Sequence, residues 1–122
     1  MPFILETTED SCRLNFNGDV TFKTIAESQQ QVDSILSLRN IKYILADFLD
    51  AEITVAENDV SELAMNSKID SIGHSGIREA IIIREEDQHL AEMYVAFARK
   101  HRSSFIYKIF NDKQEAKNWA TA

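Results

Sequence analysis

Five residues have side chains that could do chemistry, and they fall in two segments of the sequence. Asp47 and Asp50 end a mostly apolar run, and Thr54 follows Asp50 by four residues. His74 and Ser75 are neighbours in a segment that contains two glycines. Carboxylates can act as general acids or bases, whereas a serine needs a histidine that meets it in space and is oriented by a third group. We therefore treat the five as a candidate regulatory or ligand site, and we assign no catalytic residue.

The sequence lacks the usual signatures of metal and nucleotide sites. His74, His89 and His101 are separated by fifteen and twelve residues, and none forms a metal-binding spacing such as His-Glu-x-x-His. With three glycines, the chain has neither a Gly-x-Gly-x-x-Gly nor a Gly-x-x-x-x-Gly-Lys segment to hold phosphates. We therefore expect no metal, no cofactor and no enzymatic activity.

Size and composition predict one domain over residues 1–122. The chain has 122 residues, of which 44% are hydrophobic, so it can bury a core but cannot form two. Its net charge of −7 argues against nucleic acid as a partner, and no window is apolar enough for a transmembrane segment. The single cysteine, Cys12, cannot form an internal disulfide and is expected to be a small core residue. These features predict a cytoplasmic protein.

Hydrophobic periodicity predicts strands and helices in alternation. Strands are expected over residues 3–5, 12–16, 41–49, 80–83 and 105–110, and helices over 21–38, from 54 to about 71, from about 88 to 102, and 112–120. The run Ile41–Leu49 is apolar without alternation, which is typical of the central strand of a sheet. Thr54-Val-Ala-Glu57 has the spacing of a capping box, so a helix should start there. The order β-β-α-β-α-β-α-β-α predicts an α/β domain with a mostly parallel sheet of about five strands and about four helices.

These features together resemble a known family. The chain has a turn at Gly18, an Asp47 near the end of the central strand and the closing pattern Phe110-x-x-x-x-x-Ala116-x-x-Trp119. With the order of elements, this pattern is similar over nearly the whole length to the SpoIIAA-like family of small bacterial proteins. That family is STAS-like and related in fold to the CRAL-TRIO lipid-binding proteins.

The resemblance implies a regulatory protein, but it does not extend to the phosphorylation switch. Switch domains of the STAS type carry a serine, usually in an Asp-Ser-Ser-Gly-like segment, at the start of the helix after the central strand. Here the matching segment 47–57 has no Ser-Gly, and Thr54 is its one hydroxyl. We interpret Thr54 as a helix cap, because a phosphate on it would be repelled by Asp50, Glu52 and Glu57.

Three functions remain open. The first, which we favour, is a non-catalytic regulatory or protein-interaction module that binds a protein partner or self-associates as a homo-oligomer such as a homodimer. The second is a carrier of a small apolar or lipid-like ligand, suggested by aromatic residues that could equally fill the core: Phe22, Tyr94, Phe97 and Trp119. The third is an enzyme with a site at the carboxyl ends of the strands, where open α/β sheets bind ligands.

Overall fold

The computed structural model describes residues 2–122, which form one α/β unit in the predicted order of elements. In chain order the elements are β1 (Phe3–Thr7), β2 (Ser11–Thr21), α1 (Phe22–Leu36), β3 (Tyr43–Thr54), α2 (Glu57–Asp70), β4 (Arg78–Ile82), a 3-10 turn (Glu85–Asp87), α3 (Gln88–Lys100), β5 (Ile106–Phe110) and α4 (Lys113–Ala120). The predicted alternation of strands and helices is therefore confirmed.

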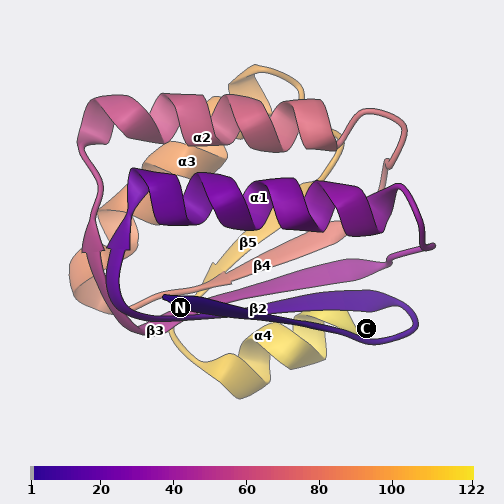
Figure 1. Ribbon diagram of the computed structural model, residues 1–122, viewed down its shortest axis with the longest axis horizontal. Coiled ribbons are helices and arrows are strands. Elements are labelled where there is room, and N and C mark those ends of the chain that lie inside the picture. Colours follow the sequence, from indigo (N-terminus) through magenta and orange to yellow (C-terminus); the bar gives the residue numbers. More distant parts are fainter. Residues whose placement is uncertain (1) are drawn as a thin grey trace.

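The five strands form one sheet in the order β1-β2-β3-β4-β5, with β3 at its centre as predicted. β1 pairs with β2 antiparallel, and every other neighbouring pair is parallel. The helices α1, α2 and α3 connect successive parallel strands and cover one face of the sheet, while α4 packs on the other face (Figure 1). Right-handed crossovers that advance in one direction place their helices on the same face, which explains this three-layer arrangement.

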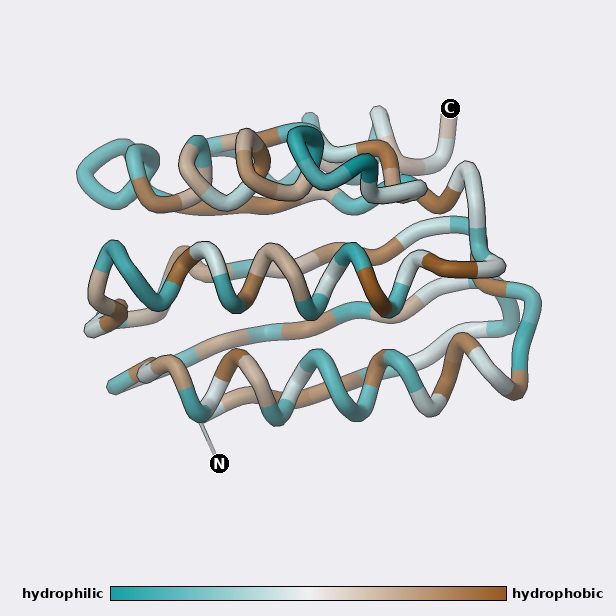
Figure 2. Tube along the Cα trace, turned by 90° about the horizontal axis from the view of Figure 1, so that it is seen from above, coloured by the Kyte–Doolittle hydropathy of each residue, from teal (hydrophilic) through white to brown (hydrophobic). Residues whose placement is uncertain are grey.

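The sheet separates two hydrophobic cores. The larger core lies under α1, α2 and α3, and it includes the fully buried Cys12, as expected. The smaller core lies under α4, where Phe110 packs against Trp119 with ring centroids 5.7 Å apart. Figure 2 shows hydrophilic and hydrophobic residues alternating along the helices, as amphipathic elements on a sheet require. Within residues 2–122, no helix is both long enough and apolar enough to cross a membrane.

Two strands, β2 and β3, continue five residues beyond the ends that the sequence pattern predicts. β2 continues through Asn17, Gly18 and Asp19, where we expected a turn, because Gly18 adopts a φ of 65° and still pairs with Ala51 of β3. β3 likewise continues to Thr54, which pairs with Thr21. Polar residues are tolerated here because this part of β2 has passed the end of its partner β1.

The predicted capping box at Thr54 is wrong. α2 begins at Glu57, and its N-cap Ala56 makes no side-chain hydrogen bond to the helix. A capping box occurs instead at the start of α1, where the Thr21 hydroxyl accepts a hydrogen bond from the Thr24 amide and the Thr24 hydroxyl accepts one from the Thr21 amide. The spacing rule fails at Thr54 because this residue is still part of the strand ladder.

A β-bulge interrupts the pairing of β2 with β3. Asn15 pairs with Asp47 but Asn17 pairs with Asp50, so β3 has one extra residue in this stretch. A bulge changes which face the following side chains point to. As a result Phe48 and Ala51, three residues apart, both belong to the core under α1, α2 and α3.

Candidate functional site

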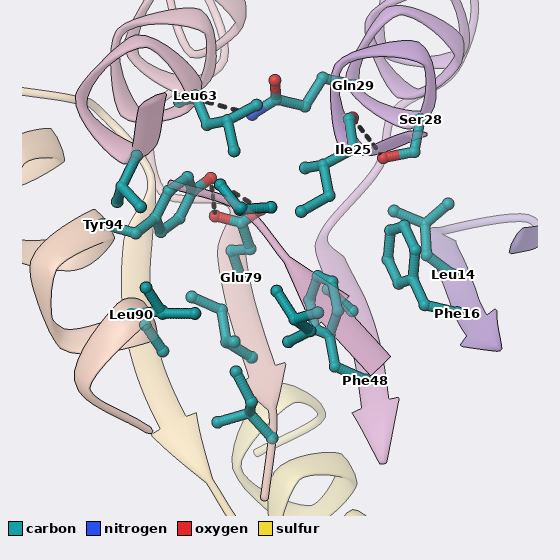
Figure 3. Close-up of a pocket in the computed structure, with 17 residues that line it drawn as sticks. Leu14, Phe16, Ile25, Ser28, Gln29, Phe48, Leu63, Glu79, Leu90 and Tyr94 are labelled. Carbon is teal, nitrogen blue, oxygen red and sulfur yellow. Dashed lines mark hydrogen bonds between the residues drawn. The ribbon is translucent and has the colours of Figure 1, made fainter. Parts of the chain in front are cut away.

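An apolar cavity of about 90 Å³ lies between the sheet and the helices α1, α2 and α3 (Figure 3). Residues of three strands and three helices contribute to its wall: Leu14, Phe16, Ile25, Ser28, Gln29, Ala46, Phe48, Ile53, Val55, Val60, Leu63, Glu79, Ile81, Ile83, Leu90, Ala91 and Tyr94. Ile53 and Val55 follow the bulge at the carboxyl end of β3, and Ile25 and Leu90 lie in the first turns of α1 and α3. These four residues are only half-buried, so the cavity comes near the surface at the carboxyl ends of the strands. Parallel sheets commonly bind ligands at these ends.

Two stacked aromatic rings form part of the cavity wall. Phe16 of β2 and Phe48 of β3 lie with centroids 4.2 Å apart and ring planes 4° apart. Phe16 also contacts Phe3 of β1 at 5.9 Å, so the stack is supported from the outer strand. Rigid aromatic walls of this kind keep an apolar cavity open, because the rings cannot turn without losing their packing.

Glu79 is the residue that gives the cavity a polar centre. It lies on β4 beside Tyr107 of β5 and is half-buried, with Tyr94 of α3 above it. The Tyr94 hydroxyl donates to the Glu79 carboxylate, with distances of 3.1 and 3.4 Å to its two oxygens. A carboxylate in such an apolar setting is costly unless it is paired or protonated.

Burial raises the pKa of Glu79 from 4.5 to about 7. The hydrogen bond from Tyr94 opposes this shift, and the carboxyl group of Asp70 adds to it. Burial and the Glu79 carboxylate raise the pKa of Tyr94 well above 10, so Tyr94 keeps its proton and remains a donor. A carboxyl group with a pKa near neutral pH in a cavity is typical of functional sites.

A network of hydroxyl groups surrounds Tyr107, which is the neighbour of Glu79 on β5. The Tyr107 hydroxyl hydrogen-bonds to Ser67 of α2 at 2.7 Å and to Ser103 at 2.6 Å. The Tyr107 ring meets the Tyr94 ring edge-on, with centroids 5.8 Å apart. These contacts hold α2, α3 and β5 together around Glu79 and fix the two tyrosine rings.

A second, polar hollow lies between α1 and α2. It has a volume of about 170 Å³, and its wall includes Asp33 of α1 and Asp70 of α2. Burial, and then the neighbouring Asp33 carboxylate, raise the pKa of Asp70 from 3.8 to about 7. Gln29 joins this hollow to the apolar cavity, since it lines both, donates to the Leu63 carbonyl at 2.8 Å and accepts from Asn66 at 3.2 Å. Nowhere in residues 2–122 do three His, Cys, Asp or Glu side chains cluster as a metal ion would need.

The structure places Asp47, Asp50 and Thr54 along β3 but gives them different surroundings. Asp47 is buried on the α4 face, where it accepts from the Leu49 amide at 2.9 Å and pairs with Lys113 at 3.4 Å. Asp50 is exposed just after the bulge. Thr54 is exposed at the strand end, and its hydroxyl lies 3.4 Å from the Val20 carbonyl.

His74 and Ser75 lie at the opposite edge of the sheet. They are in the loop between α2 and β4, where the His74 amide donates to the Ser71 carbonyl at 2.9 Å. A crossover helix returns the chain to the amino ends of the strands, so a loop that precedes a strand cannot reach the carboxyl ends. None of the five candidate residues lines the cavity or the polar hollow, and the structure does not bring the two groups together.

The sequence contained a signal for Glu79 that we did not use. Ile81 and Ile83 face the same core, and alternation along β4 places Glu79 on that face as well. A glutamate two residues before a buried pair of isoleucines therefore points inward, although at the start of a strand it resembles a solvent-exposed residue. Tyr94 was named among the aromatic residues that could fill the core, but the partner of its hydroxyl could not be deduced.

Comparison with known proteins identifies the fold. No protein-family model and no curated protein matches the sequence. Among solved structures, an uncharacterised DUF3478-family protein with a SpoIIAA-like fold from Shewanella loihica PV-4 is similar at 22% identity and a TM-score of 0.56, over 97% of this chain and 91% of that chain.

Two anti-sigma factor antagonists are also similar in structure. One from Mycobacterium paratuberculosis has a TM-score of 0.66 at 10% identity, over 98% of this chain and 93% of its own. SpoIIAA in its unphosphorylated form has a TM-score of 0.63 at 10% identity, over 98% and 96%. The chain therefore has the SpoIIAA-like, STAS-like fold that the sequence pattern indicated.

Proposed function

We propose that the chain is a non-catalytic regulatory module that acts through protein contacts, in the cytoplasm. One observation carries this proposal: large aliphatic side chains are exposed at the edge where α1 and α2 end. Leu38 is 80% exposed, Ile72 is 63% exposed and Ile69 is 54% exposed. Both helices run in the same direction and finish at this edge, on the right in Figure 1. Exposed aliphatic residues that gather at one edge commonly mark a protein contact surface.

The fold comparisons and the placement of polar residues support this function. Two of the similar structures are described as anti-sigma factor antagonists, which are regulators of other proteins. The residues that we considered for catalysis are divided between opposite edges of the sheet, and Asp47 is engaged in an ion pair with Lys113. Fold alone does not give function, so the contact surface must be tested directly.

Self-association is the form of contact that the isolated chain can reveal. Analytical ultracentrifugation over a range of concentrations should show a reversible dimer of the unmodified protein. The double variant Ile69→Ser with Ile72→Ser should remain a monomer, because it loses apolar area from the proposed surface. Ile4→Ser is the matched control, since Ile4 is 54% exposed on the outer strand β1 and should not affect the dimer. A protein that stays monomeric throughout, or a dimer that Ile4→Ser also abolishes, would contradict the proposal.

A second candidate function is the binding of a small apolar ligand, which the cavity favours. Its wall is apolar apart from a few polar groups, of which Glu79 and Tyr94 are hydrogen-bonded to each other, and many ligand sites combine an apolar wall with a few polar groups. The volume of about 90 Å³ is well below the roughly 300 Å³ at which pockets hold drug-sized or lipid-like molecules. We therefore propose a ligand far smaller than a lipid. Binding of short-chain probes, monitored at the amides of the cavity wall by NMR, tests this candidate.

A further inference from the structure

The cavity wall has one acidic group and no cation to balance it. Among the 17 residues of its wall, Glu79 is the one with an ionisable carboxyl group, and no Lys, Arg or His is present. The titratable groups that face Glu79 are the hydroxyls of Tyr94 on α3 and Tyr107 on β5 and the carboxyl group of Asp70 on α2. Asp33 of α1 faces Asp70 in turn. When Glu79 ionises, its charge therefore has one hydrogen-bond donor, Tyr94, and no positive partner in the cavity wall.

The dimensions of the cavity limit the length of a ligand. Since roughly 10 to 15 Å³ of such space holds one water molecule, about 90 Å³ has room for on the order of six small groups. The wall beyond Glu79 is hydrocarbon, from the Phe16 and Phe48 rings and the aliphatic residues Ile25 and Ile81. A ligand that fits both features has one polar end at Glu79 and a short hydrocarbon chain.

We propose that the cavity binds a small primary amine with a short aliphatic chain, its ammonium group at the Glu79 carboxylate and the Tyr94 hydroxyl. This inference rests on the ligand-binding candidate above and names the class of ligand. An ammonium group has three donors, so it can bond to both Glu79 and the Tyr94 oxygen while the chain packs against Phe16 and Phe48. A carboxylate ligand would be repelled by Glu79 and Asp70, and an alcohol would leave an ionised Glu79 without a counter-charge.

Binding of an amine must be coupled to the proton on Glu79. A positive group beside a carboxylate favours its ionised form, so the bound amine displaces the proton that Glu79 holds near neutral pH. The complex should therefore tighten as the pH rises from 6 to 8, by about tenfold for the one proton released below a pKa of about 7. An uncharged ligand of the same length brings no positive charge to favour the ionised form of Glu79. Its affinity should therefore lack this pH dependence.

The test uses n-butylamine, n-butanol and butyrate, which share a four-carbon chain and differ in the polar end. Each is titrated into isotopically labelled full-length protein at pH 6 and pH 8, and amide shifts at the cavity wall report binding. NMR suits this measurement, since about five non-hydrogen atoms can supply only modest affinity. We expect n-butylamine to bind at pH 8, about tenfold more weakly at pH 6, and more tightly than either other probe.

Two variants show whether Glu79 is responsible. In Glu79→Gln, which keeps the shape of the side chain, the preference for n-butylamine over n-butanol and its pH dependence should disappear. Asp70→Asn is the control for the second carboxyl group, and it should retain the preference. The amide spectrum of each variant without ligand shows whether it is folded. If Glu79→Gln is unfolded, Tyr94→Phe, which removes one hydroxyl, should weaken n-butylamine severalfold and n-butanol less.

The outcomes distinguish the proposal that the ligand is an amine from the proposal that the cavity binds a ligand at all. If n-butanol binds as tightly as n-butylamine at pH 8, the amine class is wrong while ligand binding in the cavity stands. If n-butylamine binds equally well to Glu79→Gln, the assignment of Glu79 is overturned. If none of the three probes shifts the cavity amides, both the amine class and the ligand-binding candidate fail.

Discussion

The Tyr94 hydroxyl on α3 donates to the carboxylate of Glu79 on β4 at 3.1 Å, across the interface between helices and sheet. This pair joins two layers of the fold by a polar contact inside an apolar cavity. Folding therefore moves a carboxyl group from water into a place where its neutral form is favoured. The free energy of unfolding should therefore depend on pH, in the direction set by the raised pKa of Glu79.

The first prediction concerns this pH dependence. The folded-state pKa of Glu79, about 7, lies above its ordinary value of 4.5, so its contribution to stability is fully present below pH 4.5 and is lost as the pH rises through 7. As the pH rises from 5 to 8, the unmodified protein should therefore lose about 1 to 2 kcal/mol of unfolding free energy relative to Glu79→Gln, which has no carboxyl group to ionise. This figure is reduced to allow for the partial solvent access of Glu79. Urea denaturation at both pH values measures it. A difference that does not change with pH would contradict the prediction.

The second prediction concerns the hydroxyl network behind the cavity. Tyr107→Phe leaves the buried Ser67 hydroxyl without its partner and should cost about 1 to 2 kcal/mol of unfolding free energy. Ser67→Ala removes the same hydrogen bond from the other side, so the double variant should lose about 1 kcal/mol less than the sum of the two. Urea denaturation of all four proteins in the cycle gives the coupling. Strict additivity would show that the Ser67–Tyr107 bond contributes nothing.

The third prediction compares two threonines that end strands. Thr21→Ala removes the cap of α1 and should lower the unfolding free energy by about 1 kcal/mol. Thr54→Ala should change it by less than about 0.5 kcal/mol, because exposed Thr54 caps no helix and its one hydrogen bond is 3.4 Å long. Thermal or urea denaturation of the two variants tests the pair. Equal losses would mean that Thr54 supports α2 after all.

The fourth prediction concerns α4, which carries the single tryptophan. Arg78 of β4 donates to the carbonyls of Trp119 at 2.6 Å and Ala122 at 2.9 Å, and its guanidinium lies 5.6 Å from the Trp119 ring centre. Arg78→Ala should loosen α4 and shift Trp119 fluorescence to longer wavelength, with easier quenching by acrylamide. It should also cost about 1 to 2 kcal/mol of stability.

Lys108→Ala is the matched control for α4. Lys108 lies over the Phe110 ring at 5.5 Å from its centre and is not bonded to Trp119. Its removal should leave the tryptophan emission unchanged. If Arg78→Ala also leaves the emission unchanged, Arg78 does not hold α4 on the sheet.

Much of the fold could be predicted from sequence because its elements carry strong periodic patterns. The apolar run at Ile41–Leu49 indicated the central strand, and the segment 112–120 with Ala116 and Trp119 indicated the last helix. Both predictions are confirmed, and in that helix Ala116 is fully buried and Trp119 contacts Phe110. Element type follows from such patterns more reliably than element length, because pairing with a neighbouring strand can extend a segment whose own residues favour a turn.

The cavity could not be predicted, because it depends on contacts between distant segments. Glu79 and Tyr94 are fifteen residues apart, and only the packing of α3 on β4 brings them together. The five candidate residues were chosen for chemical type in loops and strand ends, where polar residues are most often solvent-exposed. A polar residue on the buried face of a strand, such as Glu79, would have been the better signal.

The bulge in β3 changes which side chains after Phe48 point toward the helices. If the strand alternated regularly past Phe48, then Asp50, Glu52 and Thr54 would point toward the helices, and Ala51 and Ile53 would point away. The one extra residue restores the alignment of Val20 with Ile53 on the helix side, and so a hydrocarbon wall replaces an acidic one. Deletion of Leu49 should therefore preserve the facing of both halves of the strand, because Phe48 and Ala51 would then be two residues apart in a regularly alternating strand. The chemical character of the cavity mouth thus depends on the number of residues in β3 as much as on their identity.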